Sequence, residues 1–301
     1  MDFKGIIPPV ITPINDVHSI DEDGYAAVIE YMIEKGVHGI VVGGTTGEFY
    51  ALSPEERVRQ FRFAKEIIKS RVPLVCGVND LTTEGACGFA EAARDAGADG
   101  ILVAAPYYSL PTELENAAHC LAIDKAANLP IMLYNYPGRT GVVMGEDFLD
   151  IVSKSSNFRS IKEASGDINR LHMLANQYPS LELSCGAEDQ ALEFFVWGAT
   201  SWVTPMGNFF AEEVIALYDA CVKEQNFIKA RRIMAALLPL TTVLEGGGQL
   251  IQCTKYACAF FGLPAGTVRP PMKPLEESAM DSLQDILTTT KSAIQTILSE
   301  A

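Results

Sequence analysis

Short runs of apolar residues alternate along most of this chain with longer segments whose apolar positions recur every three to four residues. The short runs are rich in β-branched residues and predict strands, whereas the longer segments have the period of an α-helix. Eight runs predict strands at Gly5 to Ile11, Gly39 to Val42, Pro73 to Cys76, Gly100 to Val103, Pro130 to Tyr134, Ser160 to Lys162, Leu181 to Cys185 and Trp202 to Thr204. Eight βα units in succession predict an α/β fold, the (β/α)8 TIM barrel, rather than an open sheet.

Helix caps mark where several of the intervening helices begin and end. Ser53 can accept a hydrogen bond from a helix that starts at Pro54, and the glutamates that follow favour the positive end of the helix dipole. Thr82 and Thr112 precede two further helices in the same way. Gly97 ends a helix just before the next strand. These signals place one helix after each strand.

The strand pattern stops at about residue 225, and helical periodicity continues to the end of the chain. The three helical segments predicted there run from Asn226 to about Leu244, from Gln249 to about Phe261 and from Glu276 to Ser299. The glycine-rich run Glu245 to Gln249 is interpreted as a flexible helix joint, and the proline-rich run Arg269 to Pro274 as an extended one. We therefore expect a catalytic barrel, residues 1–225, and a C-terminal helical extension, residues 226–301.

Composition and charge exclude several classes of protein. The 38 acidic and 23 basic residues give a formal charge of −15, which repels a polyanion and argues against a nucleic-acid partner. Hydrophobic residues make up 48%, too many for a disordered chain, yet no apolar run approaches the roughly 20 residues of a membrane span. The chain enters a strand pattern at once, without the basic and apolar segments of an export signal. We expect a soluble cytoplasmic protein.

Cysteines and histidines give little support to a metal site. The seven cysteines are scattered, odd in number and never spaced Cys-x-x-Cys, as is typical of reduced thiols. The four histidines form no ligand pair at helical spacing; they are His18, His38, His119 and His172. We therefore expect no metal at the catalytic centre.

Lys162 is the main candidate for catalysis. It stands in the run Arg159 to Asp167, at the end of a largely apolar strand, where burial would favour the neutral amine. A neutral lysine amine can attack a carbonyl carbon and form a Schiff base. The alternative is that a lysine at a strand end simply reaches water. Residues at the other strand ends favour the catalytic interpretation.

Catalytic residues of a barrel gather on the loops after the C-terminal ends of the strands. The turn Gly43 to Glu48 can offer a carboxylate its backbone amides and the hydroxyls of Thr45 and Thr46. Three further candidates carry a phenol or a guanidinium: Tyr108 after the fourth strand, and Tyr134 and Arg139 at the end of the fifth. With Lys162, these residues supply an amine, a proton shuttle, a carboxylate clamp and a binder for a second substrate. A Schiff-base enzyme acting on a 2-oxo acid needs all four.

Four motifs follow one another along the chain: Gly-Thr-Thr-Gly-Glu, Tyr-Tyr-x-x-Pro, Tyr-Asn-x-Pro-x-Arg-Thr and Ile-Lys-Glu-Ala. This order resembles the dihydrodipicolinate synthase and N-acetylneuraminate lyase superfamily over essentially the whole chain. The resemblance implies that Lys162 forms an imine with pyruvate or another 2-oxo acid and that Tyr134 moves protons at that centre. Arg139 would meet the carboxylate of an aldehyde partner at the entrance. The imine is itself an electron sink, so no cofactor is required.

The resemblance also implies roles for the remaining candidates. Thr45 and Tyr108 would complete a hydroxyl relay to solvent, with Tyr108 reaching into the active site of a neighbouring subunit. Thr46 and the turn amides, including that of Gly47, would hold the carboxylate of the 2-oxo acid. Val203, in the eighth strand segment, is a further substrate-binding candidate. The implied assembly is a homo-oligomer, a dimer or a homotetramer.

Departures from the family pattern leave the substrate open. Phe49 and Tyr50 make the pocket wall bulkier than is usual in the synthase branch and are similar to the sugar-acid dehydratase branch, whereas Arg139 matches the synthase motif. We expect a class I Schiff-base lyase whose best assignment is an aldol condensation of the 4-hydroxy-tetrahydrodipicolinate synthase type. The alternative is a 2-keto-3-deoxy sugar-acid aldolase or dehydratase. Rivals from other classes are a non-catalytic 2-oxo-acid sensor, which would not need a proton relay, and a metal-dependent aldolase, which would need ligands.

Overall fold

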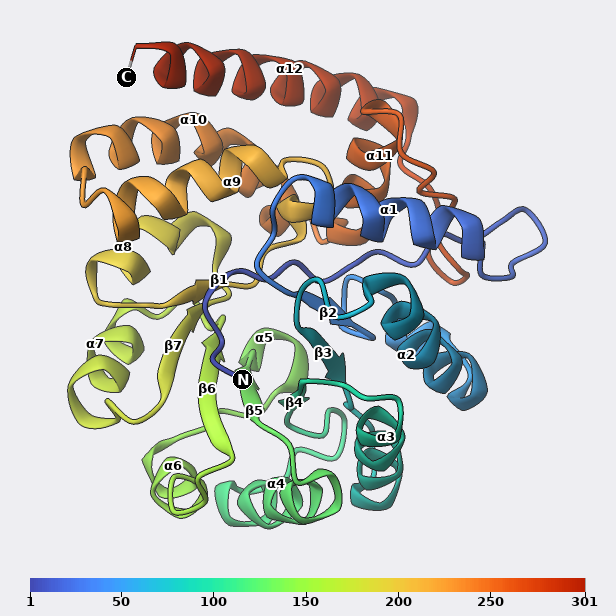
Figure 1. Ribbon diagram of the computed structural model, residues 1–301, viewed down its shortest axis with the longest axis vertical. Coiled ribbons are helices and arrows are strands. Elements are labelled where there is room, and N and C mark those ends of the chain that lie inside the picture. Colours follow the sequence, from blue (N-terminus) through green and yellow to red (C-terminus); the bar gives the residue numbers. More distant parts are fainter. Residues whose placement is uncertain (301) are drawn as a thin grey trace.

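A parallel barrel of eight strands forms the centre of the molecule in the computed structural model, which describes residues 1–300. The strands are β1 (Gly5–Ile6), β2 (Ile40–Val42), β3 (Leu74–Gly77), β4 (Gly100–Ala104), β5 (Ile131–Asn135), β6 (Phe158–Glu163), β7 (Glu182–Cys185) and β8 (Ser201–Trp202). They pair in the order β1-β8-β7-β6-β5-β4-β3-β2, and helices surround them (Figure 1). Each predicted run overlaps one of these strands, so the predicted (β/α)8 barrel is confirmed.

The barrel closes between β2 and the segment that follows β1. The backbone N–H of Val41 donates to the carbonyl of Pro8, and the N–H of Val10 donates to the carbonyl of Val41, both at 2.9 Å. Proline has no N–H to donate, so the two prolines after β1 interrupt the regular ladder. The predicted strand Gly5 to Ile11 is therefore too long, although its extended course is right.

Helices cover the outside of the strands in the predicted alternation. They are α1 (Glu22–Glu34), α2 (Pro54–Ile68), α3 (Thr83–Asp95), α4 (Glu113–Ala127), α5 (Pro137–Thr140), α6 (Glu146–Val152), α7 (Ile168–Gln177), α8 (Ala191–Val196) and α9 (Ala211–Tyr218). Short turns lie at η1 (Phe49–Ala51), η2 (Glu188–Gln190), η3 (Pro205–Asn208) and η4 (Asp219–Lys223). The predicted caps are present: Ser53, Thr82 and Thr112 each accept a hydrogen bond from the first turn of their helix.

Two apolar layers stabilise the barrel, one inside it and one between strands and helices. Successive residues of a strand point to opposite faces, so Met132 and Tyr134 of β5 belong to the inner layer and Leu133 to the outer one. Tyr134 is paired in register with Lys162 of β6. The phenol and the amine therefore project from neighbouring strands toward the inside of the barrel.

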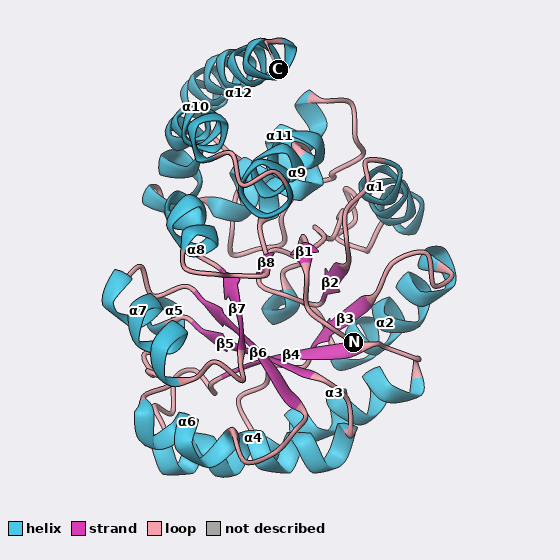
Figure 2. Cartoon of the chain, turned by 60° about the vertical axis from the view of Figure 1, so that its left-hand side comes forward, coloured by secondary structure: helices cyan, strands magenta, loops and turns pink. Residues whose placement is uncertain are grey.

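The C-terminal extension consists of α10 (Phe227–Gly246), α11 (Leu250–Phe260) and α12 (Glu277–Ser299), which confirms the three predicted helical segments. Figures 1 and 2 show α10 and α12 beyond α9 on one side of the barrel, with α11 beside α9. The interpretation of the glycine-rich run as a joint needs one change. Its first two residues, Glu245 and Gly246, lie within α10 rather than in the joint.

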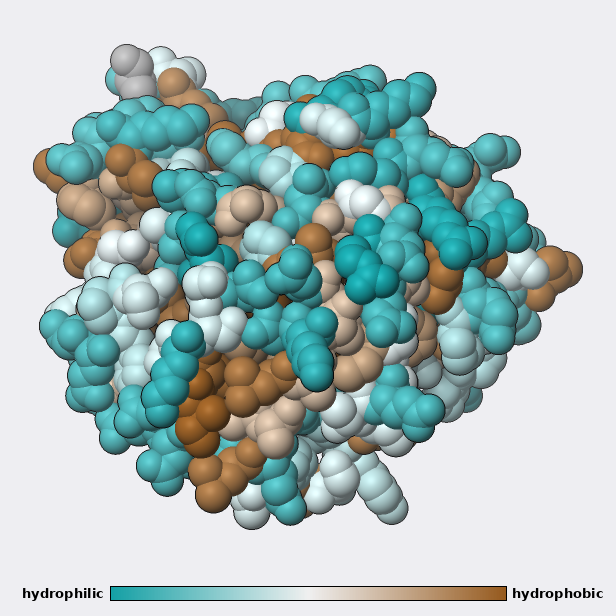
Figure 3. Space-filling view, turned by 60° about the horizontal axis from the view of Figure 1, so that its bottom comes forward, coloured by the Kyte–Doolittle hydropathy of each residue, from teal (hydrophilic) through white to brown (hydrophobic). Residues whose placement is uncertain are grey.

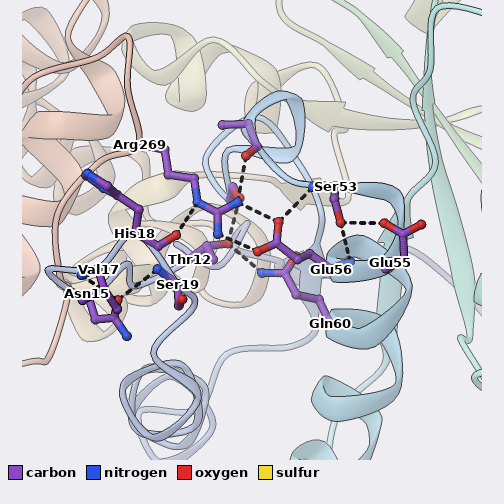
Figure 4. Close-up of polar contacts among 12 residues, drawn as sticks. Thr12, Asn15, Val17, His18, Ser19, Ser53, Glu55, Glu56, Gln60 and Arg269 are labelled. Atoms are coloured by element: carbon purple, nitrogen blue, oxygen red, sulfur yellow. Dashed lines mark hydrogen bonds and ion pairs between the residues drawn. The ribbon is translucent and has the colours of Figure 1, made fainter.

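Ion pairs connect this extension to the turn after β2. The Glu48 carboxylate pairs with the Lys255 ammonium of α11, and both side chains are buried. Arg269 donates two hydrogen bonds of 2.6 Å to the Glu56 carboxylate at the start of α2, as Figure 4 shows. Its backbone N–H donates to Glu48 at 3.1 Å. A buried charge is tolerated only when it is paired, so α11 and the turn hold one relative position.

One face of the molecule is mostly hydrophilic. Figure 3 shows a mostly hydrophilic face, teal and white, that surrounds a brown hydrophobic area. Over residues 1–300, no helix combines the length and the apolar character needed to cross a membrane.

Candidate active site

The carboxyl ends of the strands open into a cavity that the C-terminal extension completes. Its lining residues are Pro9, Gly44, Thr45, Thr46, Leu102, Tyr134, Tyr136, Arg139, Lys162, Gly186, Glu188, Val203, Pro205, Leu244, Glu245, Gly248 and Leu250. Six of the predicted site residues meet here: Lys162, Tyr134, Thr45, Thr46, Arg139 and Val203. Gly47 and Tyr108 lie outside this lining. The end of α10 and the start of α11 form part of the wall, so residues beyond 225 contribute to the site.

Lys162 stands at the centre of the cavity wall, on β6. Its side chain is 7% exposed, and its Nζ lies 4.2 Å from the centroid of the Tyr134 ring. Burial lowers the pKa of Lys162 to about 8, while the nearby Glu188 carboxyl limits this decrease. Within residues 1–300, no carboxylate oxygen lies within 4.0 Å of the amine nitrogen. About a tenth of the amine is therefore neutral at pH 7, far more than for a lysine of ordinary pKa, and the neutral form is the nucleophile.

Gly186, after β7, leaves room for the lysine. A Cβ at this position would lie 2.7 Å from Lys162 Cε and 2.9 Å from Ala164 Cβ. The Gly186 N–H donates to the carbonyl of Glu163 at 2.9 Å, which fixes the backbone there. The course of the Lys162 side chain thus depends on a glycine at position 186.

Tyr134 supplies a phenol beside the amine. It is 7% exposed, and its ring centroid lies 5.8 Å from that of Tyr136. Burial, followed by the neighbouring Tyr136, raises the pKa of Tyr134 well above its usual value. The phenol therefore stays protonated at physiological pH and can both donate and accept a hydrogen bond.

The turn after β2 presents Thr45 and Thr46 to the cavity. Gly47 next to them is committed to the turn itself: its N–H donates to the carbonyl of Gly44 at 3.1 Å, and its carbonyl accepts the Thr12 hydroxyl at 2.7 Å. The residues of this turn that line the cavity are therefore Gly44, Thr45 and Thr46. Gly47 shapes the turn without lining the cavity.

A second cavity adjoins the first and shares Thr45, Tyr134, Tyr136 and Arg139 with it. The predicted bulky wall is present here, since Phe49, Tyr50 and Tyr107 line it. Arg139, on α5, lies between the two cavities, with its guanidinium carbon 5.6 Å from the Tyr136 ring centroid. A substrate reaching from Lys162 toward this opening would pass the guanidinium.

Tyr108 lies on the surface of the chain. Its side chain is 93% exposed, and its backbone has a φ of 73°, in the left-handed region that non-glycine residues rarely adopt. Tyr107, its neighbour, lines the second cavity instead. One copy of the chain therefore does not bring the Tyr108 hydroxyl to Lys162.

Two acidic residues near the lysine were missed from the sequence. Glu188 follows β7, is 3% exposed and accepts a hydrogen bond of 2.5 Å from the Thr204 hydroxyl. Its backbone N–H donates to Glu245 Oε1 at 3.0 Å. The position of Glu188 after a strand could have revealed it. Nothing in the sequence pattern indicated Glu245, which reaches the cavity from the C-terminal extension.

No group of three or more His, Cys, Asp or Glu side chains is arranged to hold a metal ion in the described part of the chain. The polar groups that face the cavity are an amine, phenols, hydroxyls, a guanidinium and two carboxyls. This set suits proton transfer and carboxylate binding around a nucleophilic amine.

Known protein sequences match nearly the whole length of this chain. The Dihydrodipicolinate synthetase family model matches residues 2–290. The chain is 32% identical over 288 residues to 4-hydroxy-tetrahydrodipicolinate synthase from Methanothrix thermoacetophila, covering 95% of this chain and 96% of the relative. It is 34% identical over 299 residues to the protein of the same name from Salinibacter ruber, covering 95% of this chain and 98% of the relative.

Solved structures share the fold. The 4-hydroxy-tetrahydrodipicolinate synthase from Methylacidiphilum fumariolicum SolV is 31% identical and superposes with a TM-score of 0.94, covering 99% of each chain. YagE, a prophage protein of the dihydrodipicolinic acid synthase family from E. coli K12, is 29% identical with a TM-score of 0.91, covering 96% of this chain and 99% of YagE. The YagE structure is a complex with pyruvate.

Proposed function

Since the chain belongs to the dihydrodipicolinate synthetase family, we propose that it is a lyase that forms a Schiff base between Lys162 and pyruvate or a related 2-oxo acid. One observation carries the proposal. Lys162 is buried in a cavity with a pKa lowered to about 8, and its nitrogen lies 4.2 Å from the Tyr134 ring centroid. The pyruvate complex of YagE supports a 2-oxo acid as the first substrate.

The proposed chemistry assigns a step to each residue. Thr46 and the turn after β2 hold the carboxylate of the 2-oxo acid, and the neutral Lys162 amine attacks the keto carbon. Tyr134 carries one proton from the amine nitrogen to the keto oxygen and donates a second from its own phenol, so that the oxygen leaves as water when the protonated imine forms. Thr45 then restores the phenol proton through the hydroxyl relay. The protonated imine then accepts electrons from the adjacent carbon, which lets a carbon–carbon or carbon–oxygen bond form or break.

Tyr108 completes the relay from a neighbouring subunit in this proposal. Support comes from its exposure of 93% and its left-handed backbone, which hold the side chain away from its own barrel. A side chain that points away from its own barrel can reach only the cavity of another copy of the chain. The proposed assembly is therefore a homo-oligomer, a dimer or a homotetramer. A cytoplasmic location is also proposed, supported by the seven cysteines, all of them free.

The best assignment for the second substrate is an aldehyde that bears a carboxylate, in a condensation of the 4-hydroxy-tetrahydrodipicolinate synthase type. Arg139 supports it, because a guanidinium binds a carboxylate through two parallel hydrogen bonds. The relatives named above support the same assignment. A 2-keto-3-deoxy sugar-acid aldolase or dehydratase is the second candidate, and the carboxyls of Glu188 and Glu245 favour it.

The test compares rates with pyruvate plus aspartate semialdehyde against a panel of 2-keto-3-deoxy sugar acids. Turnover of either kind that disappears in Lys162→Ala supports the lyase proposal. Turnover on the sugar acids alone would replace the synthase assignment with the second candidate. Binding of pyruvate without turnover of any substrate would instead favour a 2-oxo-acid sensor. Activity that a chelator abolishes would favour a metal-dependent aldolase.

A further inference from the structure

Asn135 and Glu163 directly follow the two residues at the centre of the proposed reaction. Asn135 comes after Tyr134 on β5, Glu163 comes after Lys162 on β6, and the two pairs are in register across the strands. Successive residues of a strand point to opposite faces. Since Tyr134 and Lys162 line the cavity, Asn135 and Glu163 point toward the helices outside the barrel, and neither lines the two cavities described above.

The Glu163 carboxylate is buried, and each of its oxygens accepts two hydrogen bonds. Its side chain is 1% exposed. It accepts from Asn135 Nδ2 at 3.0 and 2.8 Å and from the Ser165 N–H at 2.8 Å. Arg170 Nε, from α7, donates at 3.0 Å and offsets the burial of the negative charge. Asn135, Glu163 and Arg170 thus form a strand-end network that links β5, β6 and α7 behind the cavity.

The strand-end network also holds the segment that connects α5 to α6. The Met144 N–H donates to Asn135 Oδ1 at 3.0 Å, and the Met144 carbonyl accepts from Arg170 Nη2 at 2.8 Å. Met144 itself is fully buried. Both backbone polar groups of this residue are therefore bonded to the side chains that hold Glu163.

Backbone hydrogen bonds extend these links to β7. The Glu163 carbonyl accepts from the Gly186 N–H at 2.9 Å, and the Asn135 carbonyl accepts from the Ala164 N–H at 3.0 Å. Gly186 is the residue that leaves room for the Lys162 side chain. A shift of Glu163 would therefore move both the backbone that carries Lys162 and the wall against which its side chain packs.

We propose that Glu163 is a positioning residue, whose carboxylate holds Lys162 Nζ and the Tyr134 hydroxyl in the relative positions that proton transfer at the keto carbon requires. Proton transfer needs groups within hydrogen-bond reach, and a misplacement of about 1 Å can cost about 100-fold in rate. The inference rests on the proposed function, because it concerns the formation of the imine on Lys162. It goes further because it assigns part of the rate to a residue that lies outside the cavity.

The test uses a graded set of variants. Glu163→Gln keeps the shape of the side chain but turns an amide N–H toward a neighbouring donor in either orientation. Arg170→Met removes the guanidinium, and Arg170→Lys keeps a cation with one nitrogen in place of the two that Arg170 uses. Arg71→Met is the matched control, because it breaks an ion pair of 2.6 and 2.7 Å with Glu30 at the surface.

Two readouts separate positioning from stability. Borohydride trapping with saturating pyruvate, carried to completion, gives the fraction of chains with a competent site. Quenched trapping gives the rate of adduct formation per competent site, and steady-state kinetics give kcat and KM for pyruvate. A purely structural role of Glu163 would lower the competent fraction and leave the rate per competent site unchanged.

We expect Glu163→Gln and Arg170→Met to lower the rate per competent site, and kcat with it, by roughly 10- to 100-fold. KM for pyruvate should change little, because the turn after β2 that is proposed to hold the carboxylate is not part of the strand-end network. Arg170→Lys should restore part of the lost rate. Arg71→Met should react at the wild-type rate.

Wild-type rates per competent site in both Glu163→Gln and Arg170→Met would overturn the inference, as would a higher KM with an unchanged kcat. If Glu163→Gln does not fold, the two Arg170 variants decide the question, because they keep the carboxylate and its bonds from Asn135 and Ser165. A wild type that forms no pyruvate adduct would refute the proposed function itself. The two failures are therefore distinguishable.

Discussion

The side chain of Lys162 occupies the space that a side chain at Gly186 would need. A Cβ at position 186 would lie 2.7 Å from Lys162 Cε and 2.8 Å from its Cγ, closer than carbon atoms approach without displacement. The direction of the amine is therefore set jointly by β6 and by the backbone after β7. The close packing of Lys162 against the Gly186 backbone restricts the directions that the flexible lysine side chain can take in the cavity.

Replacing Gly186 with alanine should displace the amine. We expect Gly186→Ala to lower the rate of adduct formation with pyruvate by about 100-fold, the cost of misplacing a reacting group by about an ångström. Gly88→Ala on α3 is the control, because no atom lies within 4 Å of a Cβ there. Stopped-flow or quenched trapping measures both rates. Equal rates in the two variants would show that Lys162 has more freedom than the structure indicates.

The activity should depend on the fraction of Lys162 that is deprotonated. Its pKa is lowered to about 8 by burial, so the neutral amine decreases tenfold for each pH unit below that value. We expect kcat/KM to rise with pH and to level off above about 8. In Glu188→Gln the midpoint of the rise in kcat/KM should move to lower pH, because the Glu188 carboxylate favours the charged ammonium of Lys162. A midpoint that stays in place, or rises, would contradict the proposed electrostatic link.

Tyr134→Phe removes the phenol and keeps the ring. We expect kcat to fall by roughly 100- to 10,000-fold, the usual contribution of a positioned acid–base group, while KM changes little. Tyr256→Phe, on α11 and outside both cavities, is the matched control. Steady-state kinetics on the best substrate measure kcat and KM for both variants. A kcat that Tyr134→Phe leaves intact would place the proton transfer elsewhere.

The buried pair of Glu48 and Lys255 should matter for stability. Lys255→Met leaves the Glu48 carboxylate buried without its cation, and we expect a loss of roughly 3–5 kcal/mol in the free energy of unfolding. Lys35→Met, which breaks an exposed pair with Glu212, should cost at most about 1 kcal/mol. Urea unfolding followed by tryptophan fluorescence measures both. Similar losses in the two variants would mean that the buried pair does not hold the extension in place.

The barrel could be predicted because its strands and helices have clear periods and caps. The strand ends were placed within a few residues, except where prolines interrupt the ladder after β1. The same order of strands brought Lys162, Tyr134, Thr45, Thr46 and Arg139 together, since a barrel gathers its carboxyl ends around one cavity. The strand period therefore located most of the candidate site.

Glu245 shows what the sequence pattern could not reveal. It follows Lys162 by more than eighty positions and lies in a helix outside the βα repeat, so no strand end points to it. Only the packing of the extension over the barrel brings it to Glu188. Nor could the sequence show that the Gly47 N–H donates to Gly44 within the turn, because such hydrogen bonds depend on geometry that residue types do not specify.

Borohydride trapping with pyruvate, followed by peptide mass spectrometry, is the most direct test of a Schiff base on Lys162. We expect one reduced adduct, on Lys162, that forms faster as the pH rises toward about 8 and is missing in Lys162→Ala. An adduct on a different lysine, or none at all with pyruvate and with 2-keto-3-deoxygluconate, would contradict it.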